Sequence, residues 1–414
     1  GIFAATDRLR VYVLDPKTLI LSDFARAACD STSVRVAKWS PEGTYIALGD
    51  CIYGGSMIAT SSTLKVFSFQ QFASDISDRL TLFASVPLVD SIFSTAKIYT
   101  TGLDWTQDGR FVSVGGTDIA NRTSYIYIYE FDPADPSPLA LFVYRLSGEG
   151  ACATVDFTKD DTLLIAGLWN PRDSQNDAVV KVFKFNKSSQ NQDIRLYSSS
   201  AMPYGDNGGG TSPYVYGDDC SLCVEFNKEY DFAAVGGVVA RFFGYKENRD
   251  ELQLYNVYQD AQEVVDSKIY TQSGGSSVYA AEFSFDEQFV AVGGIGAAAV
   301  DGFTTQQALR VYKFNKVSEK LIPLCGIQTG YDSGLSDLKW SPDGKYIAIA
   351  GVSGNYFGLY QFNGTSLTQI ISPSSGYVAQ RKVSWHPSGK YLALDGKIYQ
   401  LKTLRSEESR EGKE

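Results

Sequence analysis

Four acidic residues share one position in a recurring pattern, because each directly precedes an aromatic residue at the end of a short apolar run. They are Asp104, Asp156, Glu225 and Glu282, and in three further copies the position holds Lys38, Lys339 and Ser384. If the runs are strands around one axis, these residues form a ring, and its carboxylates supply the oxygen ligands that calcium prefers. The alternative is structural: Lys38 pairs with Asp104, Lys339 pairs with Glu282, and water fills the axis.

Other residues that commonly do chemistry are scarce. The single histidine, His386, excludes multi-histidine metal sites, and any Ser-His-Asp or Cys-His mechanism would have to use it. It stands in a turn where other copies of the pattern have Ser or Thr, which favours a turn-capping role over catalysis. Cys220 and Cys223 have the spacing of half a zinc site without a second half. These two cysteines, and Cys29 with Cys51, are candidates for disulfides or for reduced thiols.

Composition excludes several classes of partner. The 414 residues include 37 Lys and Arg against 47 Asp and Glu, a net charge of -10. Without a basic cluster this is the wrong sign for binding nucleic acid. No apolar run reaches the roughly 18 residues that a membrane span needs. The chain is therefore predicted to be a soluble acidic protein with no membrane span.

A repeat organises the chain. The segment VAKWSPEGTYIALGD, from Val36, returns near residues 102, 154, 223, 281, 338 and 383. Its aromatic anchors are Trp39, Trp105, Phe157, Phe226, Phe283, Trp340 and Trp385. A regular return of this kind indicates one supersecondary unit per repeat.

Each repeat predicts four antiparallel strands. The part that recurs in every repeat is a hairpin. A strand ends in the aromatic anchor, a turn such as Ser-Pro-Asp-Gly follows, and a second strand ends in or near Gly. A third strand, such as LRVYKF from Leu309, and a shorter fourth, such as SLTQII from Ser366, complete the unit. Such a unit, covered on both faces by its neighbours, is the blade of a β-propeller. Only the stretch from Gln70 to Leu80 could form a short helix.

The ends of the chain predict how the ring closes. The segment from Arg8, RLRVYVLDPKTLILSD, resembles third and fourth strands, whereas the C-terminal part supplies a hairpin and a short strand, KIYQL. We therefore expect an all-β single propeller over residues 1–404, with seven four-stranded blades, or eight, closed by pairing of N- and C-terminal strands. Residues 405–414 are predicted to be a charged, disordered tail.

The repeats resemble the WD-repeat family of β-propellers, most plainly in WSPEG, WSPDG and WHPSG followed by an apolar strand. The resemblance covers nearly the whole chain and implies a binding scaffold. No repeat carries the Gly-His or Trp-Asp pair of that family, so the family's buried His-Asp network is absent. The segment HPSGKYLAL and the Tyr-x-Phe-Asn strand ends are also similar to seven-bladed lactonase-like propellers, which implies a sugar-lactone hydrolase.

Long inserts on one face of such a propeller are the predicted binding surface. They carry the aromatics Tyr204, Tyr214, Tyr216, Phe242, Phe243 and Tyr245. Tyr and Phe flanked by Gly, Asn and Ser are typical of protein or glycan interfaces. Alternatively, these side chains pack the inserts onto the propeller.

The leading hypothesis is a non-catalytic scaffold that binds a protein partner, or assembles with itself, through this loop-rich face, with no cofactor. One alternative is a lactonase-like hydrolase with a cation, such as calcium, in the axial channel. Another is a structural subunit of an extracellular assembly. The Tyr-rich composition, the 2 Met and the start at Gly1 favour a secreted or cell-surface protein over a cytoplasmic one.

Overall fold

The computed structural model describes only part of the chain. The described residues are 7–15, 17, 21–28, 33–53, 59–88, 98–118, 123–149, 151–158, 160–169, 180–188, 195–200, 220–227, 232–238, 252–256, 263–268, 277–295, 299–328, 334–351, 357–371 and 383–395. Their regular elements are all β-strands. Within these ranges, no helix has the length and apolar character needed to cross a membrane.

The strands follow one another as antiparallel neighbours in groups of four. Two of these groups are β3 (Ser33–Trp39), β4 (Tyr45–Tyr53), β5 (Ala59–Phe69) and β6 (Leu80–Pro87), then β7 (Ile98–Trp105), β8 (Phe111–Asp118), β9 (Thr123–Phe131) and β10 (Leu139–Glu149). Another is β23 (Leu335–Trp340), β24 (Tyr346–Gly351), β25 (Phe357–Phe362) and β26 (Leu367–Ile371). The last joins both ends of the described chain: β27 (Val383–Trp385), β28 (Tyr391–Asp395), β1 (Asp7–Leu14) and β2 (Leu21–Ala28).

The remaining strands form one 12-stranded sheet. They are β11 (Ala151–Phe157), β12 (Leu163–Trp169), β13 (Val180–Lys184), β14 (Arg195–Ser200), β15 (Cys220–Phe226), β16 (Phe232–Val238), β17 (Leu252–Asn256), β18 (Glu263–Lys268), β19 (Ser277–Phe283), β20 (Phe289–Ile295), β21 (Leu309–Asn315) and β22 (Lys320–Ile327). Separate four-stranded sheets were expected here. They are merged because β12 pairs with β15 at Trp169 and Cys220, and β16 pairs with β19 at Val238 and Ser277. Each of these links is a single residue pair between neighbouring groups of four strands.

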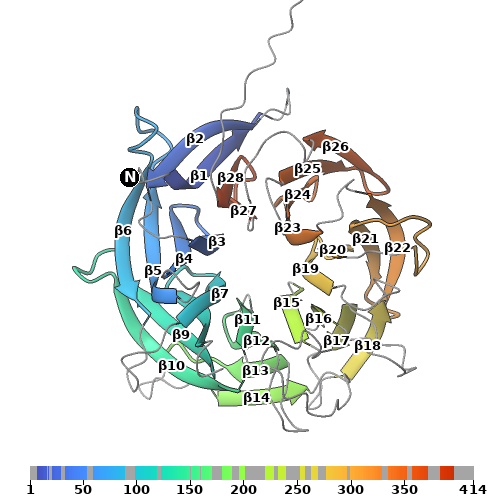
Figure 1. Ribbon diagram of the computed structural model, residues 1–414, viewed down its shortest axis with the longest axis horizontal. Coiled ribbons are helices and arrows are strands. Elements are labelled where there is room, and N and C mark those ends of the chain that lie inside the picture. The colour runs from blue at the N-terminus through green and yellow to red at the C-terminus, as the bar shows by residue number, and fades with distance from the viewer. Residues whose placement is uncertain are drawn as a thin grey trace, which may run out of the picture.

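The sheets stand around a central axis as a single all-β propeller, with the first strand of each group innermost and the fourth outermost (Figure 1). The hydrophobic core lies between neighbouring groups. One cluster combines Val36 and Leu64 of one group with Leu103, Trp105 and Tyr127 of the next. Strands covered on both faces bury nearly every side chain, which explains continuous apolar runs such as YIAIAG in β24.

Tight turns close the predicted hairpins. After β3, the Ser40 hydroxyl accepts the N–H of Tyr45 at 3.0 Å, and the N–H of Gly43 donates to the Ser40 carbonyl at 2.9 Å. Gly43 has φ +75°, a left-handed conformation that glycine adopts without a steric cost. Residues 70–79, the stretch that could have formed a short helix, form turns instead, with i-to-i+3 hydrogen bonds from Ala73 to Gln70 and from Asp78 to Asp75.

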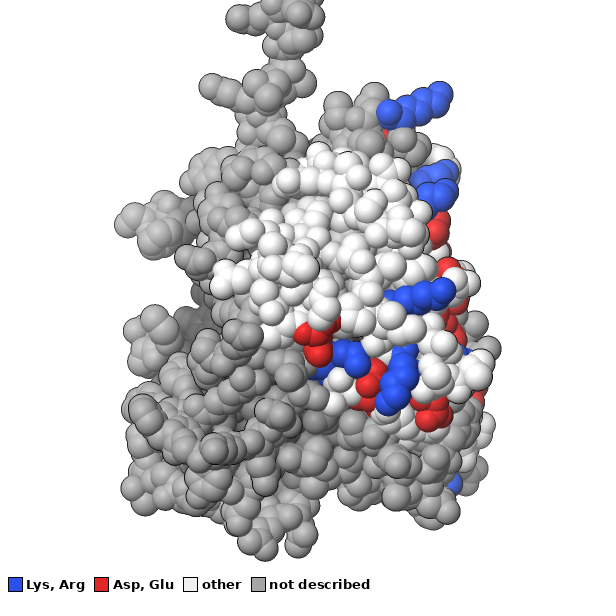
Figure 2. Space-filling model, turned by 90° about the vertical axis from the view of Figure 1, so that its right-hand side faces the viewer, with Lys and Arg blue, Asp and Glu red and all other residues white. Residues whose placement is uncertain are grey.

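Large apolar side chains remain exposed on the outer strands. Leu82 on β6, Leu141 on β10 and Ile322 on β22 expose 55%, 48% and 46% of their surfaces. On the side that carries β21 and β22, much of the described surface is uncharged, and the Lys, Arg, Asp and Glu side chains gather along one part of it (Figure 2). The outer strands therefore expose apolar surface that could take part in a contact with another molecule.

The pairing of β1 with β28 predicts a specific cross-link between the two ends of the chain. Val11 lies opposite Ala393 in this ladder, and Leu392 is one position out of register, on the other face. Directly opposed residues are close enough for a disulfide. The double variant Val11→Cys with Ala393→Cys should therefore cross-link on mild oxidation, as measured by mass spectrometry of the linked peptides. Val11→Cys with Leu392→Cys should not, and equal cross-linking of both would contradict the register.

Candidate functional site: the axial channel

The ring residues predicted from the sequence all lie near the C-terminal ends of the innermost strands. Lys38, Asp104, Asp156, Glu225, Glu282, Lys339 and Ser384 are the next-to-last residues of β3, β7, β11, β15, β19, β23 and β27. An innermost strand has no neighbour on its axial side, so its N–H groups there need acceptors from elsewhere. The ring residues supply several of those acceptors.

Side chains of the ring bind the backbone of the following strand group. The N–H of Phe157 donates to Asp104 Oδ2 at 2.8 Å, and the N–H of Phe226 donates to Asp156 Oδ2 at 3.2 Å. The N–H of Trp340 donates to Glu282 Oε2 at 2.5 Å, and the N–H of Trp39 donates to Ser384 Oγ at 3.4 Å. In each bond the donor is an aromatic anchor. The pattern of a polar residue before an aromatic therefore encodes a contact between neighbouring groups.

The tryptophan anchors make a second contact with the same preceding strand group. Their indole Nε1–H groups donate to the backbone carbonyl of the ring residue in the preceding group. The pairs are Trp39 with Ser384 at 3.1 Å, Trp105 with Lys38 at 3.2 Å, Trp340 with Glu282 at 3.2 Å and Trp385 with Lys339 at 3.0 Å. Trp39 and Trp340 are thus fixed at both their backbone and their side-chain donors.

Two lysines balance part of the negative charge in the channel. Lys38 Nζ lies 3.3 Å from Asp104 Oδ1, and Lys339 Nζ lies 3.2 Å from Glu282 Oε1 and 3.5 Å from Glu225 Oε2. The ion pairs of Lys38 with Asp104 and of Lys339 with Glu282 were predicted from the sequence and are confirmed. The channel therefore contains fixed ion pairs rather than an uncompensated ring of carboxylates.

Burial and neighbouring charges shift the protonation of the ring. Burial would lower the pKa of Lys38, but Asp104 and other carboxylates outweigh it, so the pKa is raised above its ordinary value. Burial raises the pKa of Glu282 to about 7, against the attraction of Lys339. Burial also raises the pKa of Asp156 well above its ordinary value, and the neighbouring carboxylates Glu225 and Asp104 add to the shift. These acids hold a proton more tightly than acids in water.

The described residues contain no cluster of three or more His, Cys, Asp or Glu side chains that could hold a metal ion. The expected calcium site at Asp104, Asp156, Glu225 and Glu282 thus has no ready-made ligand set in this part of the chain, and it stays a prediction. Two small cavities adjoin the ring, of about 60 and about 220 Å³. Asp156 and Glu225 line both of them.

His386 has a structural position. Its Nε2 lies 3.0 Å from the carbonyl oxygen of Gly43, and its Nδ1 accepts the N–H of Ser388 at 3.0 Å, so Nε2 carries the proton. The ring packs edge-on against Trp39, with 4.6 Å between centroids. Burial lowers the pKa of His386, which keeps it neutral. These contacts fit the turn role and add a link between the last and first hairpins of the chain.

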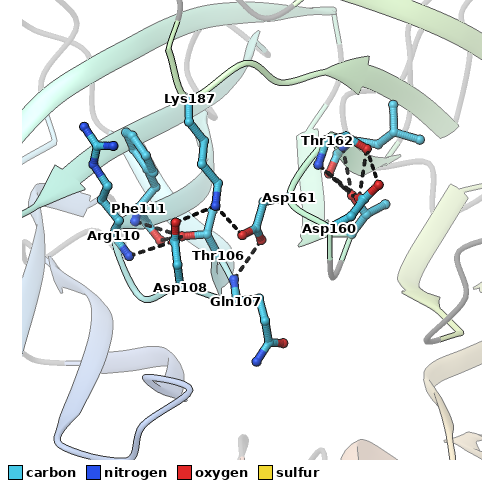
Figure 3. Close-up of polar contacts among 11 residues, drawn as sticks. Thr106, Gln107, Asp108, Arg110, Phe111, Asp160, Asp161, Thr162 and Lys187 are labelled. Atoms are coloured by element: carbon cyan, nitrogen blue, oxygen red, sulfur yellow. Dashed lines mark hydrogen bonds and ion pairs between the residues drawn. The ribbon is translucent and has the colours of Figure 1, made fainter.

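Sequence reasoning missed a second polar cluster, on the turns outside the channel (Figure 3). Lys187 Nζ contacts Asp108 Oδ2 and Asp161 Oδ2, each at 2.5 Å, and Asp161 Oδ1 accepts the N–H of Gln107 at 2.7 Å. Asp161 has φ +56°, at the turn position where Gly109 stands in the preceding repeat. An acid in a glycine position was the sequence signal that could have revealed this contact.

The other predicted site residues are not tested. Tyr204, Tyr214, Tyr216, Phe242, Phe243 and Tyr245 lie outside the described residues, as do Cys29 and the tail at 405–414. Cys220 and Cys223 both lie on β15, and Cys51 lies on β4. The disulfide pairings remain predictions.

One repeat of the chain matches a known family model. Residues 323–355, which include β23 and β24, match the model described as WD domain, G-beta repeat. This match, together with the propeller fold, confirms the resemblance to WD-repeat-like propellers. A comparison with curated protein sequences finds no significant match.

Solved structures of two functional kinds share the fold. The periplasmic gluconolactonase PpgL of Pseudomonas aeruginosa is 14% identical, with 91% of this chain and 94% of that chain covered and a TM-score of 0.66. A chain of the mitotic checkpoint complex is 13% identical, with 95% and 93% covered and a TM-score of 0.54. Sqt1 from Chaetomium thermophilum is 16% identical, with 85% and 75% covered and a TM-score of 0.53. At these identities the likeness shows the fold alone.

The raised pKa of Glu282 predicts that stability falls as pH rises. Between about 4.5 and about 7 the folded chain holds a proton that the unfolded chain releases, so acidification within this window stabilises the fold. Asp156 acts in the same direction. We expect a higher thermal midpoint at pH 5 than at pH 8, with a difference in unfolding free energy of about 1–3 kcal/mol.

The variant Glu282→Gln should reduce this pH dependence, because the amide cannot titrate while its oxygen still accepts the N–H of Trp340. Glu130→Gln is the control, since Glu130 pairs with Arg110 on the surface, where the two side chains expose 36% and 54%. An unchanged slope in Glu282→Gln would contradict the assignment.

The cluster on the turns predicts an unequal effect of two lysine variants. Lys187→Met leaves the Asp161 carboxylate, only 4% exposed, without its cation, so unfolding in urea should show a loss of about 1–3 kcal/mol. The control is Lys345→Met, because Lys345 and its partner Asp343 are 67% and 47% exposed. It should change stability by no more than about 0.5 kcal/mol. Equal losses of unfolding free energy in the two variants would show that burial of Asp161 does not make its ion pair with Lys187 more stabilising than a surface pair.

Proposed function

We propose that the chain is a non-catalytic, WD-repeat-like propeller that serves as a protein-interaction scaffold through its loop-rich face. One observation carries this proposal: three of the four axial carboxylates, those of Asp104, Asp156 and Glu282, accept N–H groups of neighbouring strand groups. Asp104 and Glu282 each make such a bond and an ion pair with a lysine. A lactonase would need a carboxylate or a bound cation free to act on substrate.

The scaffold we infer is a closed ring of seven blades. The 12-stranded sheet divides into three runs of four strands, which together with the four four-stranded sheets make seven. Closure is supported by the ladder from Leu9 opposite Asp395 to Val13 opposite Tyr391. The bonds from Trp39 to Ser384 also join the first and last hairpins.

The binding surface we propose is the loop-rich face, to which the inserts that carry Tyr214 and Tyr216 would contribute. Support for a protein partner comes from the fold, since a chain of the mitotic checkpoint complex is among the similar structures. Self-assembly is the second arrangement, and the exposed Leu82, Leu141 and Ile322 favour it because they provide apolar area at the outer edge.

The proposal is tested by partner capture with matched variants. The immobilised protein should retain a specific partner from an extract of its source, and Tyr214→Ser with Tyr216→Ser should lose it. Val317→Ser is the control, because Val317 is 98% exposed on the β21–β22 turn, on the opposite face. Loss of capture by the control alone would place the surface elsewhere.

The alternative functions have their own readouts with the same material. Hydrolysis of glucono-δ-lactone above the spontaneous rate, with calcium present, and its loss in Glu225→Gln would overturn a non-catalytic role. Concentration-dependent polymerisation in sedimentation velocity would instead identify a structural subunit.

A further inference from the structure

The larger of the two cavities beside the ring has a distinct chemistry. Its volume is about 220 Å³, below the roughly 300–1,000 Å³ of pockets for drug-sized ligands. It lies where β11, β15 and β19 end, beside the turns that follow them, and thus on the face opposite the long inserts. Its lining includes Asp156, Glu225, Phe157, Phe226, Phe283 and Phe285. The size suits a small ligand or one side chain of a larger one.

The neutral polar side chains of the lining already have hydrogen-bond partners in the turns. Asn227 accepts the N–H of Phe232 at 3.0 Å and donates to Glu287 at 3.3 Å. The Ser284 hydroxyl donates to Asp286 at 2.6 Å and accepts the N–H of Phe289 at 3.0 Å. The two carboxylates are therefore the polar groups that remain to recognise a ligand.

Asp156 is a buried carboxylate without a cation. It is 8% exposed, and no Lys or Arg nitrogen of the described residues lies within 4 Å of it. The two lysines of the channel are held elsewhere, Lys38 by Asp104 and Lys339 mainly by Glu282. Glu225 has only the longer contact to Lys339, at 3.5 Å. The carboxyl group that has no cation partner among the described residues thus lies beside the cavity, and a cation that enters would favour its ionised form.

The aromatic walls decide which kind of cation fits. Phe285 exposes 59% of its surface, while Phe157, Phe226 and Phe283 are buried and line the same cavity as the carboxylates. Phenyl rings attract an ammonium through their faces and cover an alkyl chain, but they offer nothing to a calcium ion, which takes six to eight oxygen ligands. An alkyl chain that ends in an ammonium satisfies both parts of this lining.

We propose that this cavity binds a primary alkylammonium, either a free amine or the lysine side chain of a peptide, with its nitrogen at Asp156 and Glu225 and its methylenes against the phenylalanines. The site is independent of the proposed partner face, because it lies at the other end of the channel. Failure of partner capture would leave it unaffected.

The test is a thermal and calorimetric titration of the full chain with n-butylammonium chloride. Binding should raise the midpoint, and n-butanol or sodium chloride at equal concentration should not. Asp156→Asn should weaken binding about tenfold or more, since the amide cannot ionise beside the ammonium while its oxygen can still accept the N–H of Phe226. Phe285→Ala should weaken it about threefold. Glu130→Gln is the control and should bind like the wild type, because Glu130 pairs with Arg110 on the surface and does not line this cavity.

Several outcomes would overturn the proposal. They are an equal response to n-butanol, wild-type binding by both Asp156→Asn and Phe285→Ala, or a response to calcium chloride but not to n-butylammonium. If Asp156→Asn does not fold, Glu225→Gln takes its place. Titration with acetyl-Gly-Lys-Gly-amide separates the two sources, because tighter binding than n-butylammonium identifies a lysine side chain and weaker binding identifies a free amine.

Discussion

The propeller depends on how the innermost strands satisfy their axial N–H groups. These strands are sheet edges that face a narrow channel, where an unpaired N–H costs free energy. At four anchors, the polar side chain one residue before the aromatic of the preceding strand group meets this demand. Asp104, Asp156, Glu282 and Ser384 bind the anchor N–H of the next strand group. One repeated pair of residues thus both packs the core and joins its sheets.

The same solution brings acids into a low-dielectric channel, and their charge must be balanced. Two lysines occupy ring positions and pair with Asp104, Glu282 and Glu225. Asp156 receives an N–H but no cation, and burial together with its acidic neighbours raises its pKa. The two lysines therefore pair with only part of the ring. Asp156, which has no lysine within 4 Å among the described residues, adjoins the cavity lined by phenylalanines. Structural acids and a ligand site can share residues in this way.

Contacts between turns add to the contacts along the axis. His386 reaches Gly43, Asp161 reaches Gln107, and Asn227 reaches Glu287. Asp161 and Glu287 adopt φ +56° and +58°, which non-glycine residues rarely do, and each makes one of these contacts. The conformational cost at these positions is offset by bonds between neighbouring strand groups.

The sequence by itself determined the strands, the hairpin turns and the propeller, because alternation, turn residues and the aromatic anchors are local signals that recur in every repeat. It also predicted the ion pairs of Lys38 with Asp104 and of Lys339 with Glu282, since equivalent positions in adjacent repeats must be neighbours. Only the tertiary structure decided that ring acids accept N–H groups, that Lys187 binds Asp108 and Asp161, and that phenylalanines and Asp156 line one cavity. These features depend on distances between strands far apart in the chain, which a local pattern does not contain.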